Sequence, residues 1–102
     1  MLSHELSTDA EIDISEITAY TYQNHGVAQA LQYIDNLEEC AARLAAGEGH
    51  YKVLSDIHPQ LRVKHCQHHY IFGVMKNPRP MLVVAILHER MELIRRLKER
   101  LQ

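Results

Sequence analysis

The second half of the chain contains three consecutive hydrophobic runs whose spacing predicts β-strands. Residues 61–66 alternate between apolar and polar side chains, which is the period of a half-buried strand. Residues 69–75 are rich in aromatic and β-branched side chains, and residues 81–87 are apolar at every position. Residues 76–80 include two prolines and favour a hairpin connection. We therefore expect three neighbouring strands, with the third at the centre of the sheet and covered on both faces.

The first half of the chain shows the period of amphipathic helices. Apolar residues at helical spacing predict a first helix over about residues 8–24, which begins at a Ser-Thr-Asp N-cap and ends before a glycine. A second helix is predicted from residue 27 to a stop at Gly47. Because the break between them is short, the two helices should form an antiparallel hairpin that covers one side of the sheet. Residues 2–6 alternate just long enough to predict a short edge strand before the first helix.

A loop and a C-terminal helix complete the predicted fold. Residues 47–60 lose all periodicity and contain the turn-forming residues typical of a loop. At the end of the chain, Met91, Ile94, Leu97 and Leu101 lie three or four residues apart between basic side chains, which predicts a basic amphipathic helix. The expected fold is α+β, a small antiparallel-dominated sheet packed against an N-terminal helical hairpin, in the order β-α-α-β-β-β-α.

Charge is distributed unevenly along a chain of 102 residues, whose length is that of one domain spanning residues 1–102. Residues 1–50 carry nine acidic side chains against one basic one, a net charge of −8, whereas residues 51–102 carry ten basic against four acidic, a net charge of +6. Such asymmetry fits either an electrostatically selected partner or solvated helix faces. Cys40 and Cys66 lie in different predicted elements with no secretory signal upstream, so we expect free thiols in a reducing cytoplasm.

The eight histidines raise the question of a metal site, most of all in the segment His65-Cys66-Gln67-His68-His69. Neighbouring strand residues point to opposite faces of a sheet, and the sequence contains no second Cys/His pair with zinc spacing. We therefore expect no metal and no cofactor. The hydrophobic runs are also too short to cross a bilayer, which takes about 20 apolar residues, so no membrane contact is expected.

A cluster of basic residues suggests a second possibility. Lys52, Arg62, Lys64, His88 and Arg90 could converge at one end of the sheet and hold a phosphodiester, with His88 as acid or base. This is the equipment of a metal-independent ribonuclease. The same side chains could equally bind an acidic partner segment or the chain's own backbone.

Three segments of the chain resemble plasmid-type ParE, a branch of the RelE/ParE superfamily of toxins: YIDNLEECAARLAAGEG, LRVKHCQHHYIF and LVVAILHERMELIRRL. The opening LSTDAEIDISEITAYT is similar to the start of toxins throughout that superfamily. The resemblance covers essentially the whole chain. It implies a toxin of a type II toxin–antitoxin module that binds and inhibits DNA gyrase, that has no catalytic residues, and that is neutralised by a ParD-type antitoxin. Two alternatives stay open, a ribosome-dependent mRNA-cleaving ribonuclease of the RelE branch and a RelE-like remnant that only pairs with its antitoxin. The residues after His88 are Glu-Arg-Met, which resembles ParE rather than the ribonucleases.

The resemblance and the charge pattern together select two sets of candidate contact residues. The antitoxin is expected to lie along apolar surface flanked by basic residues, with four candidates: Arg62, Lys64, Tyr70 and Phe72. The gyrase-directed surface is expected on the C-terminal helix and the residues before it, with six candidates: His88, Arg90, Met91, Arg95, Arg96 and Arg100. No sequence-specific contact with nucleic acid is implied, and a toxin–antitoxin hetero-oligomer is expected.

Overall fold

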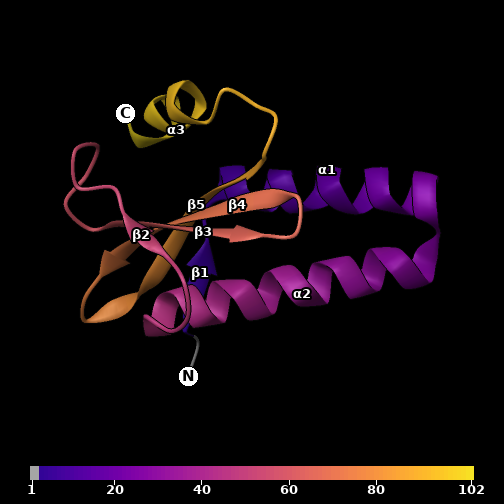
Figure 1. The fold of residues 1–102 in the computed structure, drawn as a ribbon, viewed down its shortest axis with the longest axis horizontal. Helices are drawn as coiled ribbons and strands as arrows, with labels where there is room; N and C mark the ends of the chain where they lie inside the picture. The colour runs from indigo at the N-terminus through magenta and orange to yellow at the C-terminus, as the bar shows by residue number, and fades with distance from the viewer. Residues whose placement is uncertain (1–2) are drawn as a thin grey trace.

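The structure, a computed structural model, describes residues 3–102 as a five-stranded sheet with a helical hairpin on one side and a short helix on the other (Figure 1). In chain order the elements are β1 (His4–Leu6), α1 (Thr8–His25), α2 (Val27–Ala46), β2 (Lys52–Val53), β3 (Leu61–Cys66), β4 (His69–Lys76), β5 (Arg79–His88) and α3 (Leu93–Leu101). The predicted α+β class and the predicted order of elements are confirmed, and β2 is one short strand that the pattern of residues 47–60 did not reveal. The prediction for residues 1 and 2 lies outside the described residues. No helix in the described part of the chain is long and apolar enough to cross a membrane.

The strands lie in the order β1-β5-β4-β3-β2. β3, β4 and β5 form an antiparallel meander, while β1 pairs in parallel with β5 at one edge. The prediction that the apolar run of β5 forms the central strand is wrong, because the central place belongs to β4. β5 is nevertheless an interior strand, and its run from Val83 to Leu87 is buried on both faces.

A β-bulge at Val84 reorganises the outer edge of β5. Phe72 of β4 pairs with Ala85 and Gly73 pairs with Val83, so Val84 is an extra residue without a partner in the register. The extra residue changes which backbone groups of β5 point away from β4. Beyond Leu6 and Ser7, β1 no longer covers this edge, and side chains of other elements take its place.

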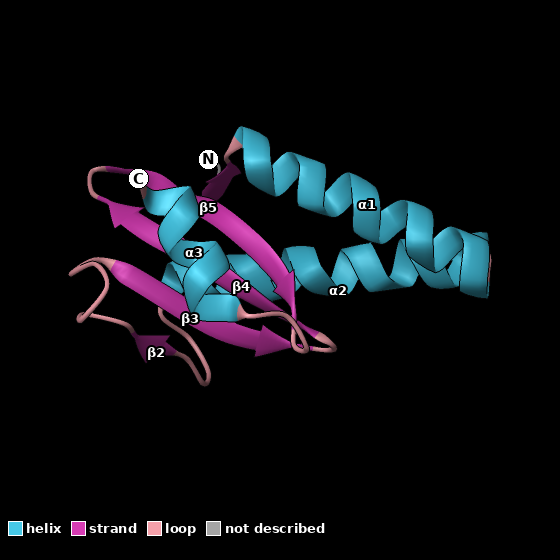
Figure 2. Ribbon diagram, turned by 90° about the horizontal axis from the view of Figure 1, so that it is seen from above, coloured by secondary structure: helices cyan, strands magenta, loops and turns pink. Residues whose placement is uncertain are grey.

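Two hydrophobic cores lie on opposite faces of the sheet (Figure 2). On one face, Leu37 and Leu44 of the helical hairpin pack with Ile71 and Ile86 of the sheet. On the other face, α3 covers a cluster around Phe72, which is 2 % exposed. The hairpin is longer than the strands, so the ends of α1 and α2 next to their connection project beyond the sheet (Figures 1 and 2).

The helix α3 docks through a different stripe from the one that its sequence suggests. Leu97 is fully buried, with Leu93 and Leu101 packed beside it, whereas Met91 and Ile94 are 43 % and 49 % exposed. The helix begins only at Leu93, so Met91 lies in the preceding loop, and helical geometry then places Ile94 away from the row formed by residues 93, 97 and 101. The predicted helix is confirmed, but the predicted apolar stripe is only partly correct.

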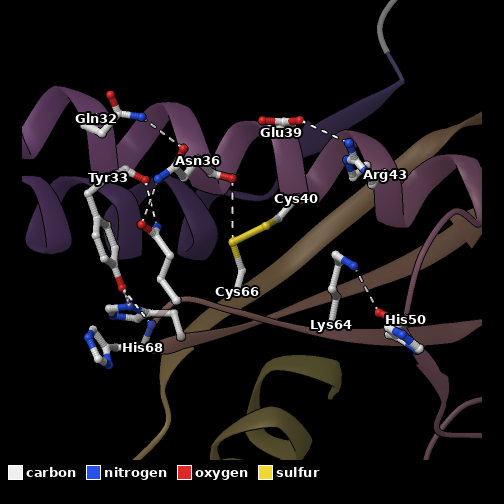
Figure 3. The surroundings of a disulfide bond; sticks show 12 residues. Gln32, Tyr33, Asn36, Glu39, Cys40, Arg43, His50, Lys64, Cys66 and His68 are labelled. Atoms are coloured by element: carbon white, nitrogen blue, oxygen red, sulfur yellow. Dashed lines mark hydrogen bonds and ion pairs between the residues drawn. A yellow bond between two sulfur atoms is a disulfide. The ribbon is translucent and has the colours of Figure 1, made fainter.

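The expectation of free thiols is wrong, because Cys40 of α2 and Cys66 of β3 form a disulfide (Figure 3). Their Cα atoms lie 6.3 Å apart, within the usual range for a disulfide. The sequence offered no signal for the pairing, because the cysteines are 26 residues apart and meet only when α2 packs on the face of the sheet formed by β3 and β4. The disulfide joins the hairpin covalently to β3.

Gly73 in β4 permits a close approach that any side chain would block. A Cβ atom at this position would collide with Sδ and Cε of Met81, which is 1 % exposed on the neighbouring strand. We expect Gly73→Ala to lower the free energy of unfolding by about 1–3 kcal/mol, because the methyl group overpacks the core. Urea denaturation measures the change.

A double-mutant cycle with Met81→Ala identifies the cause of that loss. Removing the thioether is itself expected to cost about 2–5 kcal/mol. In the Met81→Ala background the added methyl has space, so Gly73→Ala should then cost less than in the parent protein. Equal costs in both backgrounds would show that the collision is not the cause.

Candidate functional site

Histidines from three strands meet at the end of the sheet where β3 turns into β4 and β5 ends. The register places Cys66, His69 and His88 side by side, and the adjoining turn adds His68. Glu89 accepts hydrogen bonds from His65 Nε2 at 2.9 Å and from His68 Nδ1 at 3.2 Å, and the first of these bonds is the main reason that the pKa of Glu89 is lowered. These contacts join the segment leading to α3 to the β3–β4 turn.

Two further imidazoles line the floor of a groove beside this cluster. His69 is 9 % exposed, and its Nδ1 is hydrogen-bonded to the hydroxyl of Tyr33 on α2. Burial and the neighbouring imidazole of His88 lower the pKa of His69 to about 4. The rings of His69 and His88 meet edge to face at 5.1 Å, and Nδ1 of His88 accepts the backbone N–H of Arg90 at 3.1 Å. The imidazole of His69 is therefore uncharged near neutral pH.

The lowered pKa of His69 predicts a loss of stability in acid. Its pKa in the unfolded chain is the ordinary 6.5, so between pH 6.5 and 4 the unfolded state binds more protons and stability falls as the pH is lowered. At about pH 5 the loss should reach about 2 kcal/mol relative to neutral pH. His69→Gln should remove this component, which is measured as the difference between parent and variant in urea denaturation at the two pH values. Parallel pH profiles would contradict the assignment.

The groove itself lies between α1 and this end of the sheet and has a volume of about 770 Å³. Ile17 and Tyr20 of α1 form one wall, His69 and His88 form the floor, and Met91 lies at the entrance to α3. Tyr20 is 65 % exposed, so the groove is open to a partner along the projecting part of the hairpin.

A second exposed surface is formed by the basic side chains of α3 and of the loop before it. Arg90, Arg95, Arg96 and Lys98 are exposed, and the single ion pair among them joins Arg95 Nε to Glu92 at 2.9 Å. Because both partners of this pair are largely exposed, it adds little stability and leaves Arg95 accessible. We call these four residues the α3 basic face.

Arg100, which was expected to belong to that surface, is used inside the protein instead. Its guanidinium forms two 2.8 Å hydrogen bonds to the carboxylate of Asp13 on α1 and donates to the carbonyl oxygen of Val84 at 3.0 Å. Asp13 is 7 % exposed and also accepts the backbone N–H of Ile86 at 2.9 Å. The pair thus covers the edge of β5 exposed by the bulge and fastens α3 to α1. The bond to Asp13 raises the pKa of Arg100 further.

The four residues that were expected to contact the antitoxin lie in different environments. Arg62 donates to the carbonyl oxygen of Leu44 at 2.9 Å and lies over the ring of Tyr51, and Lys64 donates to the carbonyl oxygen of His50 at 3.0 Å (Figure 3). Both therefore hold the end of α2 and the following loop. Phe72 is in the core beneath α3, and Tyr70 is half-buried against the ring of His65.

The structure does not bring the basic residues of the ribonuclease alternative together. In the sheet register Arg62 is level with Gly73 and Val83, whereas His88 is level with Cys66, at the opposite end of β3. Among the described residues, no three or more His, Cys, Asp or Glu side chains are grouped so that they could hold a metal ion.

Asp13 and Tyr33 were not among the residues predicted from the sequence, although the position of Asp13 could have indicated its role. Asp13 lies between Ala10 and Ile17 at the helical spacing of the buried stripe, and an acid in that position requires a buried partner. The role of Tyr33 had no such signal, because it depends on the packing of α2 against the β3–β4 turn.

Comparison with known proteins identifies the family of this chain. Residues 5–93 match the family described as ParE toxin of type II toxin-antitoxin system, parDE. The chain is 48 % identical to Toxin ParE of Escherichia coli over 102 residues, which covers 100 % of this chain and 99 % of that protein. It is 33 % identical to Toxin ParE1 of Mycobacterium tuberculosis over 92 residues, covering 90 % of this chain and 94 % of that protein, in both strain CDC 1551 / Oshkosh and strain H37Rv. The chain belongs to the ParE family of toxins of type II toxin–antitoxin systems.

Proposed function

We propose that this toxin acts in the cytoplasm by binding DNA gyrase and trapping it on DNA, without catalytic residues of its own, and that a ParD-type antitoxin neutralises it. Membership of the ParE family is the observation that carries the proposal. The separation of Arg62 from His88 in the sheet supports a binding protein rather than a phosphodiesterase, because an acid or base and the cations that hold the same phosphodiester must all reach that one group.

The α3 basic face is the surface that we propose to contact gyrase or the DNA that gyrase holds. Arg90, Arg95 and Arg96 are retained from the sequence-based candidates, with the exposed Met91 beside them, and Lys98 joins them. Arg100 and His88 act indirectly in this proposal, because Arg100 fastens α3 and His88 supports the loop through Arg90.

The antitoxin is proposed to cover exposed apolar side chains of the helical hairpin and its groove. Four large apolar side chains of α1 and α2 are more than half exposed, namely Tyr20, Tyr22, Val27 and Leu31. An amphipathic segment of a partner would remove this surface from water. In this proposal Arg62 and Lys64 contribute little to antitoxin binding, because their charged groups already bond to the toxin's own backbone.

A supercoiling assay with gyrase, ATP and plasmid DNA tests the proposal. Purified toxin should inhibit supercoiling and increase the amount of cleaved plasmid, and the antitoxin added in equal amount should restore supercoiling. A translation extract run in parallel should show intact ribosome-bound mRNA. Site-specific mRNA cleavage with normal supercoiling would refute the gyrase proposal in favour of the ribonuclease.

A further inference from the structure

The charged side chain that lines the groove between α1 and the histidine end of the sheet favours a cationic ligand. Of the described side chains that line it, none is a lysine or an arginine, and Glu16 of α1 is the one carboxylate. An anionic group would therefore meet the Glu16 carboxylate and no lysine or arginine, whereas a cation would be attracted by that carboxylate.

The neutral imidazole of His69, at the floor of the groove, does not repel a cation. The Nδ1 atom of His69 is hydrogen-bonded to the Tyr33 hydroxyl, and that of His88 accepts the backbone N–H of Arg90. The pKa of about 4 keeps His69 uncharged throughout the physiological range. Neutral aromatic and imidazole rings attract a cation placed over their faces.

The walls fit a cation carried on an apolar stem. Tyr20 presents a largely exposed ring, and Ile17 and Met91 provide apolar surface on either side. The methylene groups of a long basic side chain pack against such surface while its charged end stays near a carboxylate. A planar guanidinium also stacks on aromatic rings, which an ammonium group cannot do, and it is the less strongly hydrated of the two cations.

We propose that this groove receives an arginine side chain of the antitoxin, with its guanidinium between the Tyr20 ring and the Glu16 carboxylate. The inference rests on the existence of an antitoxin partner, which membership of the family implies, and it does not depend on the gyrase activity. It names a specific anchor within the hairpin surface that the antitoxin is proposed to cover.

A model compound tests the site without any partner protein. N-acetyl-arginine amide titrated into ¹⁵N- and ¹³C-labelled toxin should give saturable shifts of the His69, Tyr20 and Met91 resonances. N-acetyl-norleucine amide, which has a similar stem and no charge, should bind at least about threefold more weakly. Absence of saturation with the arginine compound, or equal binding of both compounds, would overturn the proposal.

Matched variants connect the site with the antitoxin. Glu16→Gln and Tyr20→Ala should each weaken the binding of N-acetyl-arginine amide and of the antitoxin by about two- to fivefold. Tyr22→Ala is the control for the model compound, because Tyr22 is 56 % exposed on the same helix but outside the groove. Circular dichroism at 222 nm verifies that each variant is folded.

The same comparison shows whether the antitoxin uses the groove for arginine. If Glu16→Gln weakens the model compound but leaves the antitoxin affinity unchanged, the antitoxin does not place an arginine there and the proposal is wrong. If the antitoxin has no arginine whose replacement by methionine lowers its affinity for the parent toxin, the proposal is wrong as well. Neither result would alter the proposal that the toxin inhibits gyrase.

Discussion

Replacement of Asp13 by alanine is expected to lower the free energy of unfolding by about 3–5 kcal/mol, which is a large part of the total stability of a protein of this size. The carboxylate is 7 % exposed and bonds to the guanidinium of Arg100 and to the backbone N–H of Ile86. Its removal leaves a half-buried guanidinium and a backbone donor of β5 without their partner. Thermal and urea denaturation measure the loss.

Replacement of Arg100, the partner of Asp13, tests whether the loss of stability comes from the ion pair. Arg100→Met keeps much of the apolar stem but leaves Asp13 with one remaining contact, the N–H of Ile86. It should also be destabilising, and the double variant Asp13→Ala/Arg100→Met should be more stable than the sum of the two single losses predicts, because it leaves no unpaired charge. Additive losses would show that the two residues stabilise the fold independently of each other.

The pair explains why the edge of β5 is closed although β1 is short. An uncovered strand edge pairs readily with other chains, and β1 covers β5 only from Met81 to Val83. The bulge at Val84 then directs a carbonyl oxygen and an N–H outward, and Arg100 and Asp13 bond to them. The ion pair between Arg100 and Asp13 therefore covers the edge of β5 beyond β1 and also holds α3 against α1.

The order of the elements could be predicted because it depends on local patterns. The helical period, the glycine stops and the three strand runs each act within a few residues, and all of these elements were found with ends close to the expected ones. The central strand could not be chosen by hydrophobicity alone, because β4 and β5 are both buried and the positions of β1 beside β5 and of β2 beside β3 together make β4 central.

The candidate contact residues were harder to predict, because a basic side chain in a sequence does not reveal whether its charge is free. Arg100 and Arg96 are both arginines on α3, yet one is bonded to buried Asp13 and the other is exposed. Arg62 and Lys64 likewise bond to carbonyl oxygens brought close by the packing of α2 and its loop. These assignments depend on contacts between distant parts of the chain.

Reversal of three charges on the α3 basic face is expected to give the largest loss of function that leaves the fold intact. Arg95→Glu/Arg96→Glu/Lys98→Glu changes exposed side chains and spares Arg100, so the free energy of unfolding should change by less than about 1 kcal/mol. If this face meets gyrase or its DNA, the variant should need at least about tenfold more protein for half-maximal inhibition of supercoiling, because three attractive contacts become repulsive.

A control with the same change of net charge decides whether the location or the charge matters. Lys52→Glu/Lys76→Glu/Arg79→Glu reverses three exposed charges on β2 and at the β4–β5 turn, none of which belongs to α3 or to the loop before it. It should keep the inhibitory potency of the parent within about threefold, since long-range repulsion is screened at physiological salt beyond about 8 Å. Equal loss in both triple variants would mean that gyrase responds to the overall charge of the toxin, and full potency of the α3 variant would mean that α3 serves only to cover the second core.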